Sequence, residues 1–146
     1  MTNIYYIVKT VVLVGFLAYF TYEDIRERRV SNRMIIVMAA AGLVLAAVPL
    51  SAEAFIRAVI CAAVTGAAAF LTMKLSKGGL GTGDVFVLAA SGLYIGGISM
   101  LAVVFVSLAA LFLFCVGGLL LKKLNMKSKL PYIPFLLIGV IVGSLL

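Results

Sequence analysis

Histidine and tryptophan are absent from the 146-residue chain, and only two cysteines, three prolines and five acidic residues occur. Without histidine there is no Ser-His or Cys-His nucleophile pair, no imidazole metal ligand and no imidazole general base. Cys61 and Cys115 lie far apart within apolar runs, as is typical of small core residues rather than of a disulfide or metal site. We therefore expect neither a metal nor another cofactor.

Charged side chains are also scarce, at 12% of the chain, whereas 65% of the residues are hydrophobic. A soluble globular domain has only about 45–50% apolar residues, so this chain has too little polar surface to coat a water-soluble particle. We expect an integral membrane protein that uses lipid as its main solvent. A spanning helix takes about 20 residues, which predicts one transmembrane domain over residues 1–146 and no separate soluble domain.

Six apolar runs predict an all-α, polytopic bundle of six transmembrane helices. The first run lacks a basic n-region and an Ala-x-Ala cleavage signal, so we expect a retained helix rather than a signal peptide. Small residues four positions apart are expected to let helices pack closely; these pairs are Ala62 and Gly66, Gly92 and Gly96, and Gly139 and Gly143. Turns are expected at residues 51–53 and at Gly96 and Gly97. The predicted spans are 4–20, 34–50, 54–73, 85–98, 100–121 and 131–146.

The cationic residues cluster in three loops. All but two of the 12 Lys and Arg residues follow the first, third or fifth apolar run, the exceptions being Lys9 and Arg57. Cytoplasmic loops retain Lys and Arg, so these three loops are expected at the cytoplasmic face and both chain ends outside the cytoplasm. This distribution explains the net charge of +7 as membrane topology, and no nucleic-acid partner is expected.

Only two of the acidic residues are aspartates, Asp24 after the first run and Asp84 before the fourth. The expected topology places both at the cytoplasmic ends of their helices, where they are able to meet across the bundle. Ionisable groups at membrane depth are costly and mark working sites. Two carboxyl groups that share a site titrate unequally, so one can act as an acid and the other as a base on a water molecule between them.

Each aspartate also has a simpler interpretation. Asp84 is able to cap the fourth helix by accepting backbone N–H bonds, and Asp24 is able to be one more charge on a solvated face. Glycines at 78, 79, 81 and 83 favour a special role for Asp84, since glycine permits positive φ and close backbone approach. The segment lacks the GK[ST] ending of a phosphate-binding P-loop.

With these residues in place, the sequence resembles the type IV prepilin peptidases, which are intramembrane aspartyl proteases with a GxGD motif. That motif is Gly81-Thr82-Gly83-Asp84 here. The segment 24–32, Asp-Ile-Arg-Glu-Arg-Arg-Val-Ser-Asn, is similar to the family's Asp-x-Arg-x-x-x-Ile-Pro-Asn stretch. The segment 131–135, Pro-Tyr-Ile-Pro-Phe, is similar to the start of the family's last helix. The three blocks occur in the family's order and cover nearly the whole chain.

The resemblance implies an enzyme of the inner, cytoplasmic membrane that removes the leader from type IV pilin-like precursors at the cytoplasmic face. It implies Asp24 and Asp84 as the catalytic pair and 81–83 as the active-site loop. Glu23 and Glu27 are candidates to bind the basic leader, although they equally offset neighbouring arginines. The four-cysteine, zinc-binding segment of larger relatives has no counterpart here, so the chain is similar to the protease-only form of tight-adherence and Flp pilus systems, without methyltransferase activity.

Two positions depart from the family pattern, and other function classes fit part of the sequence. Phe86 replaces a common lysine and Ser31 replaces a proline, which predicts a changed pH optimum or a non-cleaving assembly subunit. A small proton-coupled transporter fits the composition but not the position of both aspartates at helix ends. A Ser-Lys hydrolase built on Ser76 and Lys77 is disfavoured, because adjacent residues rarely face each other on a helix.

Overall fold

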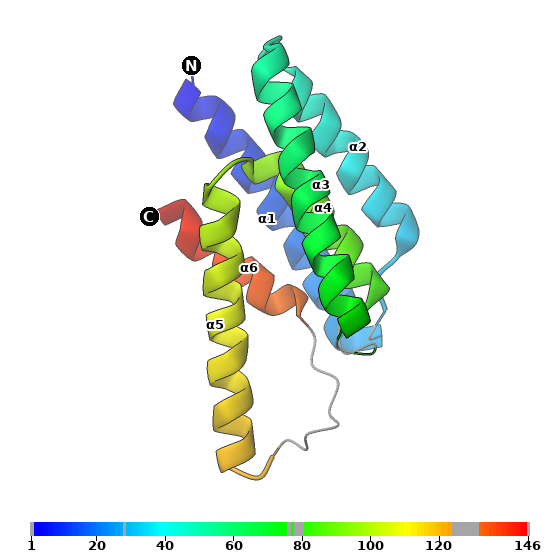
Figure 1. Cartoon of the computed structure of the whole chain (residues 1–146), viewed down its shortest axis with the longest axis vertical. Coiled ribbons are helices and arrows are strands. Elements are labelled where there is room, and N and C mark those ends of the chain that lie inside the picture. The colour runs from blue at the N-terminus through cyan, green and yellow to red at the C-terminus, as the bar shows by residue number, and fades with distance from the viewer. Residues whose placement is uncertain (1, 28, 76, 78–80, 124–131, 146) are drawn as a thin grey trace.

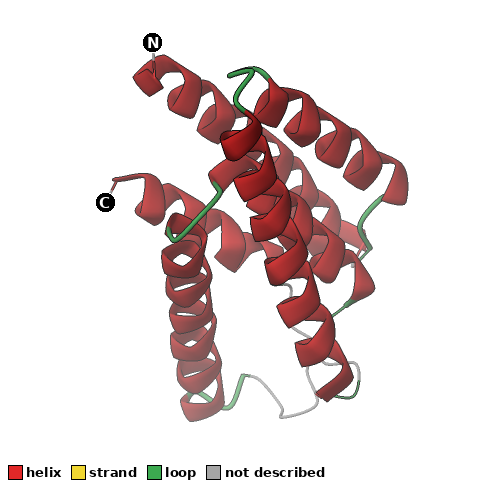
Figure 2. Cartoon of the chain, turned by 45° about the horizontal axis from the view of Figure 1, so that its top comes forward, coloured by secondary structure: helices red, strands yellow, loops and turns green. Residues whose placement is uncertain are grey.

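The computed structural model of the chain is an all-helical bundle (Figures 1 and 2) and describes residues 2–27, 29–75, 77, 81–123 and 132–145. The prediction of an all-α fold is confirmed. Six helices follow one another along the described parts of the chain, and they are α1 (Thr2–Glu27), α2 (Asn32–Ala47), α3 (Ala52–Leu75), α4 (Thr82–Ile95), α5 (Ser99–Leu120) and α6 (Ile133–Leu145).

Helix α4 is the centre of the bundle, since it contacts each of the other five helices. Eight of its 14 residues are buried, from Val85 to Tyr94. Its main partner is α3, while α5 packs chiefly on α6 and α6 in turn on α1. An element that contacts every other element is held from all sides, so α4 is suited to position a reactive side chain.

Only three of the six helices are long and apolar enough to cross a membrane, judged by length and composition among the described residues: Asn3–Glu27, Ala52–Leu75 and Ser99–Leu120. Helices α2, α4 and α6 have 16, 14 and 13 residues, fewer than the about 20 that a span requires. The predicted number of six helices is therefore confirmed for the described residues. Three of these helices have the length and composition of a span, and that all six cross the membrane stays a prediction.

Glycines set the closest helix contacts in the bundle. A Cβ on Gly92 of α4 would lie 2.8 Å from the Ala62 Cα of α3, and one on Gly139 of α6 would lie 2.6 Å from the Val103 carbonyl oxygen of α5. A Cβ on Gly66 would lie 2.9 Å from the Ala89 Cβ. The expected packing role of the small residues is thus confirmed at these positions.

Gly96 differs from the other small residues, because it packs against nothing within 4 Å and forms the turn between α4 and α5. Gly96 and Gly97 have φ values of +66° and +67°, which other residues rarely adopt. The turn predicted at these two glycines is confirmed, and the pairing of Gly96 with Gly92 as a packing motif is wrong.

Tyrosine hydroxyls tie the helices together through polar contacts. The Tyr94 hydroxyl of α4 donates to the Met38 carbonyl of α2 at 2.6 Å, and the Tyr5 hydroxyl of α1 donates to the Leu45 carbonyl of α2. A hydrogen bond inside a bundle in lipid adds to van der Waals packing, which is the main source of helix association there.

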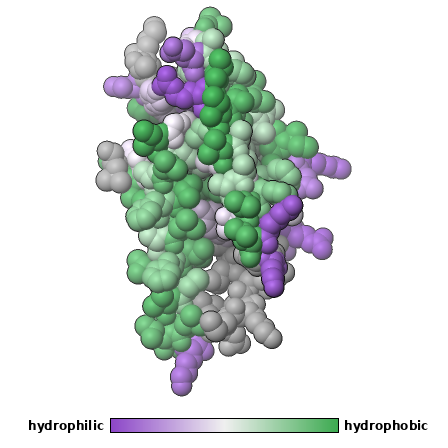
Figure 3. Space-filling model, in the orientation of Figure 1, coloured by the Kyte–Doolittle hydropathy of each residue, from purple (hydrophilic) through white to green (hydrophobic). Residues whose placement is uncertain are grey.

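The surface of the bundle is largely apolar. On α5, Leu101, Phe105, Phe112 and Leu113 are each more than 60% exposed, and hydrophobic side chains cover most of the face drawn in Figure 3. Hydrophilic side chains gather toward the margins of that face. Apolar side chains on the outside of a bundle are suited to contact lipid.

Candidate active site

Asp24 continues the buried stripe of α1. Leu13, Leu17 and Phe20 are fully buried, and Asp24, which follows them at helical spacing on the same face, is only 9% exposed. Its Oδ2 atom is buried and finds no hydrogen-bond partner within the described parts of the chain. The interpretation of Asp24 as one more charge on a solvated face is therefore wrong.

Asp84 lies in the first turn of α4, directly after the glycine-containing loop. Gly81 is the N-cap residue of this helix, and its backbone N–H donates a hydrogen bond to the Asp84 side chain. This is one half of a capping box, in which the third helical residue reaches back to the N-cap. Asp84 thus caps α4 as the simpler interpretation expected. This hydrogen bond occupies only part of the hydrogen-bonding capacity of the carboxyl group.

Gly83 brings the loop before α4 against the segment after α1. A Cβ on Gly83 would lie 3.2 Å from the Val30 Cβ, so a larger side chain would press on that segment. Val30 lies six positions after Asp24, and Gly83 immediately precedes Asp84. The contact therefore joins the two sequence blocks that carry the aspartates.

The two aspartates interact electrostatically. The pKa of the Asp84 carboxyl is raised to about 6. Burial is the main cause and repulsion from the Asp24 carboxylate adds to it, while the hydrogen bond from Gly81 acts in the opposite direction. A like charge has this effect only at short range, because exposed charges are screened within about 10 Å. Asp24 on α1 and Asp84 on α4, hereafter the aspartate pair, therefore lie close enough for their charges to interact, on two helices that contact one another.

The neighbouring glutamates have different surroundings. Both oxygens of Glu23 are engaged, one by the Tyr19 hydroxyl at 3.0 Å and the other by the Ser31 backbone N–H at 3.1 Å. Glu27 is the last residue of α1 and is exposed. Glu23 therefore holds the segment after α1 in place. For Glu27, no hydrogen bond or ion pair to another described residue is seen. A substrate contact for either residue stays a prediction.

Tyr132, just before α6, extends the site toward α5. Its hydroxyl lies 2.8 Å from the Ser107 Oγ of α5, and the residue is 5% exposed. Burial raises the pKa of the Tyr132 hydroxyl, the hydrogen bond to Ser107 lowers it, and the charge of Asp84 raises it again. The Tyr132 ring thus lies within electrostatic reach of the aspartate pair.

The loop residues 81–83 differ from expectation in their backbone. Gly81 has φ −72° and ψ 151°, and the glycines with positive φ among the described residues are Gly96 and Gly97. Gly81 and Gly83 therefore do not use the positive φ that glycine permits. The expected close approach of the backbone is found at Gly83. Thr82 is exposed at the start of α4. Gly78 and Gly79 lie outside the described residues.

Sequence reasoning missed the contacts of Val30 and Tyr132 at this site. Val30 and Tyr132 both stand in segments that resemble family blocks, yet nothing in those patterns states what the side chains touch.

A comparison with known families gives one finding for this chain. A family model described as the type IV leader peptidase family matches residues 11–146. That range includes the aspartate pair, the loop 81–83 and the segment that begins α6. No curated protein and no solved structure matches the chain significantly.

Proposed function

The chain belongs to the type IV leader peptidase family and is a leader peptidase-like protease, and we propose that it is an intramembrane aspartic endopeptidase. In this proposal it removes the N-terminal leader from type IV pilin-like precursors, of the Flp or pseudopilin class, at the cytoplasmic membrane face. The observation that carries the aspartic assignment is the electrostatic interaction between Asp24 and Asp84 across α1 and α4.

The chemistry follows from the unequal surroundings of the two carboxyl groups. Asp84 holds the shared proton of the pair, since burial and repulsion raise its pKa to about 6, and Asp24 is ionised. The Asp24 carboxylate removes a proton from water as the water oxygen attacks the scissile carbonyl carbon, and Asp84 donates its proton to the carbonyl oxygen. Collapse of the tetrahedral intermediate then breaks the C–N bond: Asp24 gives its proton to the leaving amine, and one hydroxyl of the intermediate returns a proton to Asp84 as the new carboxyl group forms.

The position of the pair suits a substrate whose cleavage site lies at the membrane surface. Asp24 is near the end of α1 and Asp84 is in the first turn of α4. Glu27 is exposed next to the pair, so we propose that it, rather than the engaged Glu23, receives a Lys or Arg side chain of the leader. The apolar part of the precursor remains in lipid.

The proposed orientation follows the basic residues. Arg26, Arg29 and Arg33 lie at or near the α1–α2 connection. Lys74 is in the last turn of α3 and Lys77 follows that helix, while Lys122 follows α5. The ends of α1, α3 and α5 point toward one end of the bundle, away from the chain's N-terminus (Figure 1). By the positive-inside rule this end is cytoplasmic, and both chain termini lie outside in an inner membrane.

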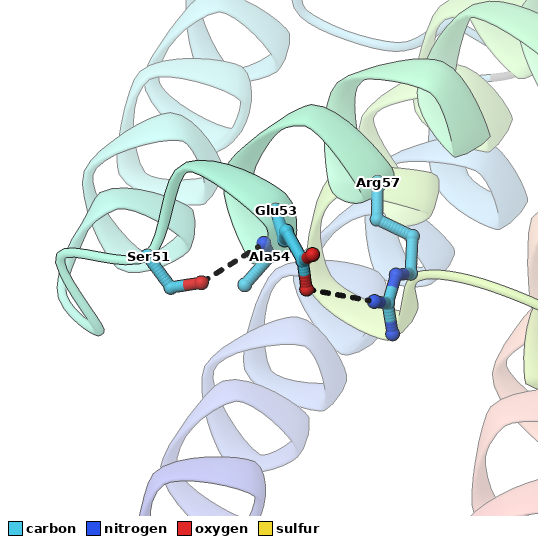
Figure 4. A network of polar contacts seen from close by, with 4 residues as sticks. All are labelled: Ser51, Glu53, Ala54 and Arg57. Atoms are coloured by element: carbon cyan, nitrogen blue, oxygen red, sulfur yellow. Dashed lines mark hydrogen bonds and ion pairs between the residues drawn. The ribbon is translucent and has the colours of Figure 1, made fainter.

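The opposite end of the bundle has a different polar arrangement (Figure 4). Ser51 accepts a hydrogen bond from the Ala54 backbone N–H at 3.4 Å, and Glu53 pairs with Arg57 at 3.8 Å. Both charged side chains are mostly exposed, and such a pair contributes about 0–1 kcal/mol to stability. This network caps α3, and Glu53 provides an acidic control residue remote from the proposed site.

The proposed function is tested by co-expression of the chain with a Flp-type or type IV prepilin in cells that lack their own leader peptidase. We expect a shortened precursor on a gel, with a new N-terminus that mass spectrometry places after the leader. The purified protein in proteoliposomes should not dissipate a proton gradient, which separates the peptidase from a proton-coupled transporter. An uncut precursor in the presence of inserted protein would contradict the proposal.

The pH dependence of cleavage is expected to reflect the proton on Asp84. The pair is active only while it holds one proton, so kcat/KM of the free enzyme should fall as the pH rises through about 6. Substrate excludes further water and disfavours the second negative charge, so the corresponding decline in kcat should come at higher pH. Both profiles are measured with a purified prepilin in detergent, over roughly pH 4.5 to 8.5. A kcat/KM that stays level throughout would contradict the assignment of the proton to Asp84.

A further inference from the structure

Thr21 lies one helical turn before Asp24 on α1. Its hydroxyl oxygen is buried and has no hydrogen-bond partner among the residues that the structure describes, as is also true of the Asp24 Oδ2 atom. Residues three apart lie on the same face of a helix. Two buried polar atoms without partners among the described residues therefore occur one helical turn apart on the face of α1 that carries Asp24.

Other threonines in the bundle use their hydroxyl groups differently. Thr10, Thr65 and Thr72 each donate a hydrogen bond to the carbonyl oxygen four residues earlier, at 2.8–2.9 Å. This local bond is the ordinary way for a helical threonine to satisfy its hydroxyl group. Thr21 makes no such bond, so its hydroxyl remains available for an interaction outside its own backbone.

An unpartnered buried polar atom is costly. Leaving one without a hydrogen bond loses the hydration of that atom with nothing in return, and native structures keep few of them. Asp24 and Thr21 supply two of them one helical turn apart. Apolar side chains at Leu13, Leu17 and Phe20 occupy the preceding turns of this face, so the two polar atoms are confined to the part of α1 that faces the site.

We propose that Thr21 is a positioning residue that orients the attacking water molecule against Asp24, an inference that rests on the proposed function. The water donates one hydrogen bond to the Asp24 Oδ2 and the other to the Thr21 Oγ1, which directs an oxygen lone pair at the scissile carbonyl carbon. Thr21 transfers no proton. The water proton goes to Asp24 and the proton of Asp84 goes to the carbonyl oxygen, as in the mechanism above.

The test compares Thr21→Ser with Thr21→Ala in the prepilin cleavage assay. Both variants lose the methyl group, so they differ only in the hydroxyl. We expect Thr21→Ala to lower kcat about 10- to 100-fold with KM changed less than about twofold, because orienting a reactant affects the transition state more than substrate binding. Thr21→Ser should retain kcat within about threefold of the parent.

Thr65→Ala is the matched control, since Thr65 is buried but its hydroxyl is already bonded to its own helix. Its kcat should stay within about threefold of the parent. The inference is overturned if Thr21→Ala keeps full kcat, or if Thr21→Ser and Thr21→Ala are equally impaired. If Asp24→Asn or Asp84→Asn still cleaves, the proposed function itself fails, whatever the Thr21 variants do.

Discussion

The variants Asp24→Asn and Asp84→Asn are each expected to abolish leader cleavage. An asparagine keeps the size of the side chain, but it neither accepts a proton from water nor donates one to a carbonyl oxygen. Residues that act as a unit fail together, so either change should lower kcat by at least about 1,000-fold. Cleavage is measured with the purified variants and a purified prepilin, over incubations long enough to detect that residual rate.

Glu53→Gln provides the matched control for these two changes. Glu53 is an exposed acidic residue that pairs with Arg57 in the first turns of α3 (Figure 4). The start of α3 and the end of α1, which carries Asp24, lie at opposite ends of the bundle (Figure 1). The Glu53→Gln change removes one negative charge, as the Asp variants do, and should leave kcat within about twofold of the parent. Substantial cleavage by either Asp variant, with the variant inserted in the membrane in normal amount, would contradict the assignment.

Gly92→Ala is expected to disturb the packing of α4, the helix that carries Asp84, on α3. The added Cβ would lie 2.8 Å from the Ala62 Cα and 2.9 Å from the Ala62 backbone nitrogen, and backbone atoms do not yield as a flexible side chain does. Overpacking of this kind costs about 1–3 kcal/mol. Because α4 carries Asp84, a shift of α4 relative to α3 should also reduce cleavage. Thermal unfolding in detergent measures the first effect and the cleavage assay the second.

Gly117→Ala is the control for the glycine change, because a Cβ at Gly117 of α5 meets nothing within 4 Å. Alanine favours the helix by about 1 kcal/mol over glycine, so this variant should unfold at the same temperature as the parent or slightly above it. An equal loss of stability in both variants would mean that the close approach of α3 and α4 does not set the effect.

Much of the fold was predictable from the sequence because lipid imposes simple rules. Apolar runs predicted six helices in the correct order, and the turn at Gly96 and Gly97 followed from the two adjacent glycines. Lengths were predicted less well. Helix α1 continues to Glu27, past the apolar run that ends at Phe20, since its buried face extends through Asp24. Hydropathy alone does not distinguish residues covered by protein from those covered by lipid, so the burial of eight of the 14 residues of α4 could not be predicted from its apolar run.

The candidate site was predictable only as far as its residue types and their place along the chain. Asp24 and Asp84 followed from the scarcity of acids, from helix ends at one face and from the resemblance. The contact of Gly83 with Val30 depends on the register between α4 and the segment after α1, which no local pattern encodes. The same holds for Tyr132, whose hydrogen bond to Ser107 requires the packing of α6 on α5.

The central claim, that Asp24 and Asp84 face one another, is tested most directly by cross-linking. The double variant Asp24→Cys with Asp84→Cys is made in a background with Cys61→Ala and Cys115→Ala, and is treated in membranes with a mild oxidant or a short thiol-reactive cross-linker. Cleavage by a protease between α2 and α3 then reports the link, since a linked chain remains one band on a non-reducing gel. We predict efficient linkage for this pair and none for Asp24→Cys with Glu53→Cys, whose two cysteines are also separated by the cut; equal absence of linkage in both pairs would contradict the account.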